Sequence, residues 1–170
     1  MSWIGVDPGK KGAIARISES GAIQIERMPM VTGAKGRDEY NLTAIREILR
    51  SWADGAGCLV TIEKSQPMPP HMRGGSSASF HRGVARGWEW MCAGMGIPYL
   101  LVSPVQWMRV MHIGTPGEDT KQRSILAAQR LFPGANLMRT ERARKPDDAF
   151  AEALLLAEFG RRSTRAEKAG

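Results

Sequence analysis

The order of apolar segments constrains the fold of this chain most strongly. Three short apolar runs, at residues 2–6, 12–17 and 23–28, are separated only by glycine-containing turns, which predicts strands joined by antiparallel hairpins. Two later runs, 58–63 and 97–102, are separated by a stretch with helical periodicity, which predicts a parallel pair with a right-handed crossover. We therefore predict an α/β fold: a mixed five-stranded sheet (three antiparallel hairpin-linked strands, then two parallel) flanked by helices in three layers.

Apolar residues at helical spacing predict the segments that cover this sheet. Helices are expected at 42–52 after an Asn41 cap, at 80–95, around Trp107 and Met111, at 120–131, and from Pro146 to about Gly160. Residues 31–40 and 64–79 are polar or rich in Gly and Pro, which indicates loops. We expect one domain over residues 1–162, followed by a basic, disordered tail at 163–170.

The charge of the chain favours a polyanionic partner. The net charge is +7 over 170 residues, and Lys and Arg that neutralise phosphates gain affinity through counterion release. A solvated basic surface without a partner is the alternative. Cys58 and Cys92 lie in apolar segments, so we expect buried thiols and no zinc site. No apolar run approaches the roughly 20 residues of a membrane span, and no signal pattern is present, so a soluble intracellular protein is expected.

Four acidic residues stand where this fold could bring them together. Asp7 and Glu63 each end an apolar run, and Asp148 and Glu152 lie one helical turn apart near the C-terminus. Carboxylates at one edge of a sheet are suitable ligands for Mg²⁺, and two ions roughly 4 Å apart can promote phosphodiester hydrolysis. The alternatives are an Asp7 that only forms a turn before Pro-Gly, and a solvated helix face for Asp148 and Glu152. Asp147 could cap the helix.

Basic residues flank these acids along the chain. Such side chains could follow DNA phosphates without reading the sequence, although each could also be an idle surface charge. The candidates are Arg73, Arg82, Arg86, Lys121, Arg142, Arg144 and Lys145, with Arg139 in the same basic loop as the last three.

Three motifs in order resemble those of the RuvC-type Holliday junction resolvases, which have a ribonuclease H-like fold. Residues 4–9 (Ile-Gly-Val-Asp-Pro-Gly) resemble the first motif of that family, and residues 60–64 (Val-Thr-Ile-Glu-Lys) resemble the second. Residues 151–157 (Ala-Glu-Ala-Leu-Leu-Leu-Ala) are similar to the helical motif that carries the last acids. The resemblance covers about residues 2–162 and is closest to phage and chloroplast members, whose helix motif ends like residues 157–162.

The resemblance implies a metal-dependent, structure-selective endodeoxyribonuclease that resolves Holliday junctions or other branched DNA in phage DNA processing, recombination or repair. It implies Mg²⁺, which Mn²⁺ can replace, with two ions held by catalytic and metal-binding acids. These acids would be Asp7, Glu63, Asp148 and Glu152. It also implies a homodimer without a membrane partner, acting in the cytoplasm of a bacterial or phage-infected host cell.

The last motif departs from the family pattern. Bacterial members place two acids, or a histidine and an acid, three residues apart, whereas Asp148 and Glu152 are four apart. An offset of four still puts both on one helix face. An alternative register makes Asp148 the final acid and Lys145 its partner. We prefer the first because of the Ala-Glu-Ala-Leu match.

Two segments carry further expectations from the resemblance. The loop after the second motif is expected to enter the junction centre, where Met68, His71, Met72 and Phe80 could pack against unstacked bases. The helix at 80–95 could form a dimer face or be an ordinary core helix.

Two other functions are compatible with parts of the sequence. An ATPase of the actin and sugar-kinase superfamily would need a duplicated domain that 170 residues do not hold. A catalytically inactive junction-binding protein of the same fold is the remaining alternative, and the presence of all four acids argues against it.

Overall fold

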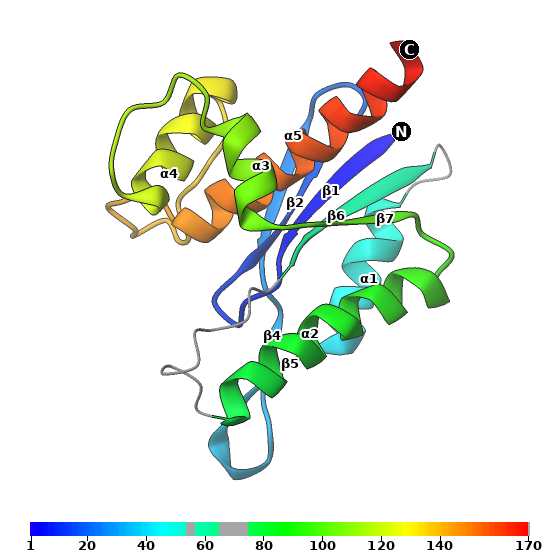
Figure 1. The fold of residues 1–170 in the computed structure, drawn as a ribbon. Coiled ribbons are helices and arrows are strands. Elements are labelled where there is room, and N and C mark those ends of the chain that lie inside the picture. Colours follow the sequence, from blue (N-terminus) through cyan, green and yellow to red (C-terminus); the bar gives the residue numbers. More distant parts are fainter. Residues whose placement is uncertain (54–56, 65–74, 170) are drawn as a thin grey trace.

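A five-stranded sheet forms the centre of the molecule (Figure 1). The computed structural model describes residues 1–53, 57–64 and 75–169. The strand order is β3-β2-β1-β6-β7, with antiparallel pairing among the first three strands and parallel pairing of β1 with β6 and of β6 with β7. The strands are β1 Ser2–Asp7, β2 Ala13–Ile17, β3 Ile23–Arg27, β6 Cys58–Glu63 and β7 Tyr99–Val102. The predicted mixed sheet is confirmed.

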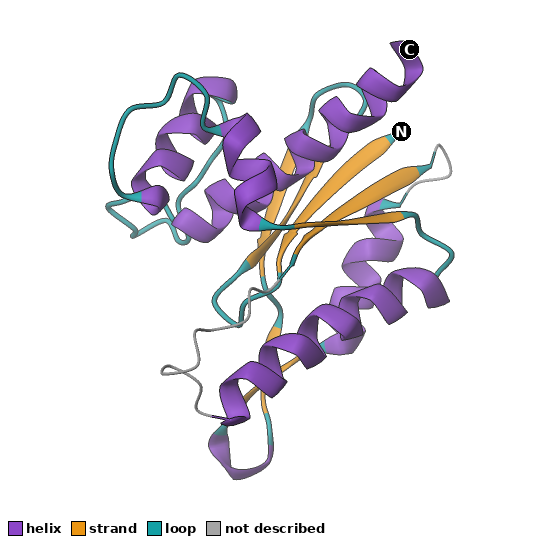
Figure 2. Ribbon diagram, in the orientation of Figure 1, coloured by secondary structure: helices purple, strands orange, loops and turns teal. Residues whose placement is uncertain are grey.

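Helices cover both faces of this sheet (Figure 2). They are α1 Leu42–Trp52, α2 Gly75–Gly94, α3 Pro104–Met111, α4 Thr120–Leu131 and α5 Asp148–Ala169. Helices α1 and α2 lie on one face, and α3, α4 and α5 lie on the other (Figure 1). The predicted three layers are confirmed, and none of the described helices is long and apolar enough to cross a membrane.

Alternating side chains of the strands feed two separate cores. On the α1–α2 face, Ile4 and Val6 of β1 are fully buried with Ile45 and Leu49 of α1. On the opposite face, β2 contributes small residues such as Ala15, which pack in one cluster with α5. Small residues let the helix backbone approach the strands closely, so α5 sits directly over the middle of the sheet.

Gly5 shows how close that approach is. A Cβ atom at Gly5 would lie 2.0 Å from the carbonyl oxygen of Ala153 and 2.3 Å from the amide nitrogen of Ala157. Both are backbone atoms of α5, which cannot move aside without moving the helix. The glycine of the first motif is therefore a packing requirement that fixes the position of α5 over β1.

The C-terminal segment differs from the prediction. Helix α5 continues to Ala169, where the sequence predicted a basic, disordered tail at 163–170. One long-range contact supports the extension: Trp3 Nε1 donates to Thr164 Oγ1 at 2.9 Å. This contact joins the end of α5 to the first strand, which stabilises a segment whose sequence is polar.

The starts of two helices also differ from the prediction. Pro146 precedes α5 instead of lying in its first turn, and Asp147 caps the helix by accepting from the backbone N–H groups of Ala149 and Phe150. Helix α2 begins at Gly75, five residues before the predicted start at Phe80. The prediction missed this first part because residues 75–79 have no large apolar side chains at helical spacing.

The predicted loop at 31–40 contains regular structure. It includes β4 Met30–Thr32, the short 3₁₀ helix η1 Ala34–Gly36 and β5 Asp38–Tyr40, and β4 and β5 form a separate two-stranded antiparallel sheet. These strands have three residues each, two of them exposed, so no apolar alternation signals them.

Candidate acidic centre

Strand pairing places Asp7 and Glu63 at the same edge of the sheet. Val6 of β1 pairs with Ile62 of β6 in the parallel register. Asp7 and Glu63 are the next residues, and each is the last residue of its strand. The turn after Asp7 is anchored by the Gly9 amide, which donates to Asp7 Oδ1 at 3.1 Å. Gly12 closes this turn, since a Cβ there would lie 2.2 Å from the Asp7 carbonyl oxygen. The motif thus holds the first acid at the carboxyl end of a central strand.

Helix α5 brings the other two acids to this edge. Asp7, Asp148 and Glu152 line one pocket of about 310 Å³. The remaining lining residues are Gly9, Lys11, Gly12, Lys121, Arg139, Asp147 and Ala149. Lys145 is exposed on the loop before α5 and is not among the residues that line this pocket, whereas Asp148 and Glu152 both are.

The pKa values show that the acids share one electrostatic environment. The pKa of Glu152 is raised to about 8, mainly by burial and also by the charges of Asp7, Glu63 and Asp148. Burial also raises the pKa of Glu63 to about 7, with a smaller contribution from Asp7. The pKa of Asp7 is raised by burial and by Asp148. Clustered, partly desolvated carboxylates with raised pKa values are typical of functional sites.

Each of the other three acids has its own partner from the α3–α4 region. Trp107 Nε1 of α3 donates to Glu63 Oε2 at 2.7 Å. From α4, the Ser124 hydroxyl donates to Glu152 Oε1 at 3.3 Å. The Lys121 ammonium lies 2.6 Å from Asp148 Oδ2.

The Lys121 contact gives Asp148 a different charge state from its neighbours. Burial alone would raise the pKa of Asp148, but the hydrogen bond and positive charge of Lys121 outweigh it and lower the pKa. The same pair raises the pKa of Lys121. Lys121 therefore acts as an internal counter-ion of the acidic centre, and its predicted contact with a DNA phosphate stays a prediction.

The donor set suits a hard divalent cation. Carboxylate oxygens are the ligands that Mg²⁺ and Mn²⁺ prefer, and burial makes their unpaired charges costly. As the side chains stand, no group of three His, Cys, Asp or Glu residues within 1–53, 57–64 and 75–169 is arranged to hold a metal ion. In the structure Glu63, Glu152 and Asp148 each contact a different partner.

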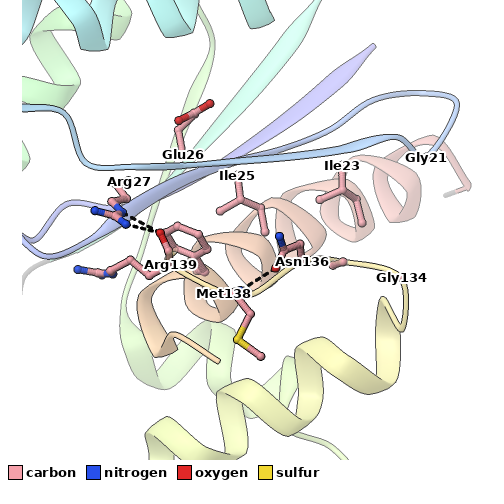
Figure 3. A pocket seen from close by; sticks show the side chains of 11 residues that line it. Gly21, Ile23, Ile25, Glu26, Arg27, Gly134, Asn136, Met138 and Arg139 are labelled. Atoms are coloured by element: carbon pink, nitrogen blue, oxygen red, sulfur yellow. Dashed lines mark hydrogen bonds between the residues drawn. The ribbon is translucent and has the colours of Figure 1, made fainter. Parts of the chain in front are cut away.

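Arg139 fastens the basic loop to the acidic centre. Its guanidinium donates to the Lys11 carbonyl at 2.6 Å and lies 2.5 Å from Asp147 Oδ2. Its own carbonyl accepts hydrogen bonds from Arg27 of β3 beside a second cavity of about 730 Å³ (Figure 3). Arg139 lines both cavities and joins the β1–β2 turn to the N-cap of α5. The Arg139 guanidinium, which the sequence grouped with the candidate DNA-binding residues, thus contacts Lys11 and Asp147 within the protein.

The other predicted DNA-binding residues occupy varied positions. Arg86 of α2 is exposed and pairs with Glu89 at 3.1 Å. Three basic residues, Arg142, Arg144 and Lys145, are exposed on the loop before α5. Arg73, Met68, His71 and Met72 lie outside the described residues, as do the side chains of Arg82 and Phe80.

Helix α2 is partly a core helix and partly exposed. Trp88 is buried, 4% exposed, whereas Trp90 is 76% exposed. Val84, Trp88 and Met91 also line an apolar cavity of about 350 Å³ together with residues of α1. Both interpretations of this helix thus retain support, and a dimer face stays a prediction.

Sequence reasoning missed the partners of the acids. Trp107 and Ser124 were expected only as helix positions, yet each contacts a carboxylate. A buried tryptophan needs an acceptor for its N–H, and this rule could have pointed from Trp107 to a nearby acid. Ser124 offers no comparable signal, because a serine in a helix usually bonds to its own backbone.

Comparisons with known proteins agree with the fold. No family model and no curated protein matches the chain. Among solved structures, RuvC of Thermus thermophilus in complex with a Holliday junction substrate is similar, with a TM-score of 0.58, 15% identity, and coverage of 98% of this chain and 96% of that one. A second T. thermophilus RuvC structure gives a TM-score of 0.56, 15% identity and coverage of 98% and 97%. The chain therefore has a RuvC-like, ribonuclease H-like fold.

Proposed function

We propose that this protein is a metal-dependent endonuclease that cleaves four-way or branched DNA. The observation that carries the proposal is the convergence of Asp7, Asp148 and Glu152 on one pocket, with Glu63 close enough to raise the pKa of Glu152. The four acids come from β1, β6 and α5: Gly5 packs β1 closely against α5, and β6 pairs with β1 in the sheet. RuvC, whose fold this chain shares, has been solved with a Holliday junction substrate.

Asp7, Glu63, Asp148 and Glu152 would hold Mg²⁺ or Mn²⁺, as two ions. The bound ions would supply Lewis acidity for activating water and for stabilising the leaving oxygen of the phosphodiester. Asp7 is held in place by the Gly9 amide, and the Trp107 hydrogen bond orients Glu63. Because Glu63 and Glu152 have pKa values of about 7 and about 8, protons compete with cations for them near neutral pH.

Basic side chains around the centre would bind the DNA backbone. Exposed Arg142, Arg144 and Lys145 precede α5 on a single loop, and Lys121 lies at the pocket itself. Such contacts neutralise phosphates and supply affinity without sequence readout. Arg73, Arg82 and Arg86, which follow β6 in the sequence, would add further phosphate contacts.

A homodimer fits the substrate we propose. A four-way junction is approximately two-fold symmetric, and two opposed cuts require two sites related by a similar axis. The exposed Trp90 and the apolar cavity beside Trp88 make α2 the candidate face. The phage and chloroplast resolvases that the motifs resemble suggest a role in DNA processing or recombination.

The alternative, a junction-binding protein without catalysis, is tested by the same assay. The wild-type protein, Asp7→Asn and the control Asp38→Asn, which changes an exposed acid of β5, are compared on a synthetic four-way junction with Mg²⁺. We expect symmetric nicks by wild type and the control, and loss of at least about 100-fold in rate for Asp7→Asn with binding retained in Ca²⁺.

Three outcomes would contradict parts of the proposal. Binding without cleavage by the wild type would favour the inactive alternative. Equal cleavage of the junction and its linear duplex arms would remove the structure selectivity but leave the nuclease. Cleavage by Asp7→Asn at the wild-type rate would show that the acidic centre does not catalyse the cleavage.

A further inference from the structure

A buried hydrogen-bonded pair stands behind Glu152. Ser124 is fully buried in α4, and His112 is 4% exposed at the end of α3. His112 Nε2 and Ser124 Oγ are 3.1 Å apart, and Ser124 Oγ is 3.3 Å from Glu152 Oε1. The three groups therefore form a continuous chain from the end of α3 to the acidic centre.

The donor count of this chain assigns its hydrogens. The Ser124 hydroxyl has one proton, and it also lies 3.1 Å from the Thr120 carbonyl, which can only accept. When Glu152 is ionised, as binding of a cation requires, it can only accept as well. If His112 Nε2 were a third acceptor, one proton would face three acceptors. The Nε2–H tautomer instead donates to Ser124, so that the hydroxyl proton is shared only between the Thr120 carbonyl and Glu152.

The surroundings of His112 keep it neutral and fixed. Burial lowers its pKa, and the charge of Arg123 lowers it further. The Trp107 ring meets the imidazole edge to face, with 5.5 Å between ring centroids. Trp107 is the residue that donates to Glu63, so one packed unit of α3 and α4 reaches two acids of the centre.

We propose that His112 and Ser124 are positioning residues that hold the Glu152 carboxylate in the orientation needed to bind the metal ion. This inference rests on the proposed metal-dependent cleavage. Neither residue touches the reacting atoms, and both act through Glu152. A partner that orients a ligating group typically contributes about 10- to 100-fold to metal affinity or activity.

The chain offers a matched control. Ser163 of α5 donates to the carbonyl four residues earlier, as Ser124 does to Thr120, but its bond leads to Phe159 and no acid. Ser124→Ala and Ser163→Ala therefore remove the same kind of helix bond, and only the first removes a contact with Glu152. His112→Leu removes the donor of the pair, whereas His112→Gln keeps an N–H near the position of Nε2.

The test combines Mn²⁺ binding by titration calorimetry with kcat and KM for cleavage of a four-way junction. We expect Ser124→Ala and His112→Leu to weaken Mn²⁺ binding and lower kcat by about 10- to 100-fold, with KM unchanged. His112→Gln should stay within a few-fold of wild type, and Ser163→Ala should match it. Thermal melting checks that each variant folds, and if His112→Leu does not, the two serine variants decide.

The outcomes separate this inference from the proposed function. Wild-type Mn²⁺ affinity and kcat in Ser124→Ala would overturn the positioning role while leaving the nuclease intact. Equal losses in Ser124→Ala and Ser163→Ala would overturn it as well, since the effect would then come from the helix. A wild-type protein that neither binds Mn²⁺ nor cleaves the junction would overturn both proposals.

Discussion

Replacing Glu152 by Gln is expected to stabilise the metal-free protein at alkaline pH. Burial and three neighbouring acids raise the pKa of Glu152 from 4.5 to about 8, so ionisation costs more in the folded protein than in the unfolded chain. Because the folded-state pKa is the raised one, the favourable contribution is complete below about pH 4.5 and is lost as the pH rises through about 8. Gln has nearly the same shape, can accept from Ser124, and does not ionise.

The size of this effect follows from the pKa difference. At about 1.4 kcal/mol for each pKa unit, the change from 4.5 to about 8 sets a ceiling of roughly 5 kcal/mol. Solvent in the pocket and the joint titration of Glu63 reduce it, so we expect the variant to gain about 1–3 kcal/mol in free energy of unfolding at about pH 9. At about pH 5 the difference should be about 1 kcal/mol or less.

Urea denaturation in EDTA, followed by tryptophan fluorescence at about pH 5 and about pH 9, measures the difference. Glu141→Gln, which alters an exposed acid on the basic loop, is the control and should change stability little at either pH. A Glu152→Gln variant that is no more stable than wild type at the alkaline pH would show that ionised Glu152 does not destabilise the folded protein. So would a gain of equal size at both pH values, because it would not come from ionisation.

Three further substitutions test how the centre is held in place. Gly5→Ala should lower the free energy of unfolding by about 3 kcal/mol, because its Cβ would lie 2.0 Å from the α5 backbone. The control Gly94→Ala, which has open space around it, should be neutral or slightly stabilising. Equal effects of the two substitutions would contradict close packing at Gly5. Trp3→Phe should lose about 1 kcal/mol of hydrogen bonding to Thr164, which hydrogen exchange would detect as faster exchange in the last turns of α5; unchanged exchange there would contradict it. Arg139→Met should destabilise the protein by about 2 kcal/mol in thermal melting, since the Asp147 carboxylate loses its guanidinium partner. Arg142→Met changes an exposed residue of the same loop and is the control. An equal loss in this control would show that the Arg139 contacts are not responsible.

The sheet could be predicted because its strands carry strong local signals. The runs ending at Asp7 and Glu63 are apolar and largely buried, and the length and composition of the segments between runs indicate which strand pairs are antiparallel and which are parallel. The short strands β4 and β5 could not be found, since three residues, two of them exposed in each strand, are too few to show an apolar alternation. The end of α5 could not be predicted either, because the hydrogen bond that stabilises it comes from Trp3, at the opposite end of the chain from Thr164, and forms only once β1 and α5 have packed together.

The acids of the site were easier to nominate than their partners. Asp7 and Glu63 follow from strand ends, and Asp148 and Glu152 follow from helical spacing. The Lys121–Asp148 pair and the Ser124–Glu152 bond depend on how α4 packs beside α5, which no local pattern encodes. The sequence left the role of Asp147 open between helix cap and metal ligand, and the structure assigns the cap through its bonds to the first turn of α5.

Locating Mn²⁺ in crystals of the protein by anomalous diffraction tests the central claim most directly. We expect anomalous peaks for Mn²⁺ ions that are coordinated by carboxylate oxygens of Asp7, Glu63, Asp148 and Glu152. Lys121 should then no longer pair with Asp148. Peaks elsewhere, or a site built on Asp147 or beside Lys145 without Glu152, would contradict this claim.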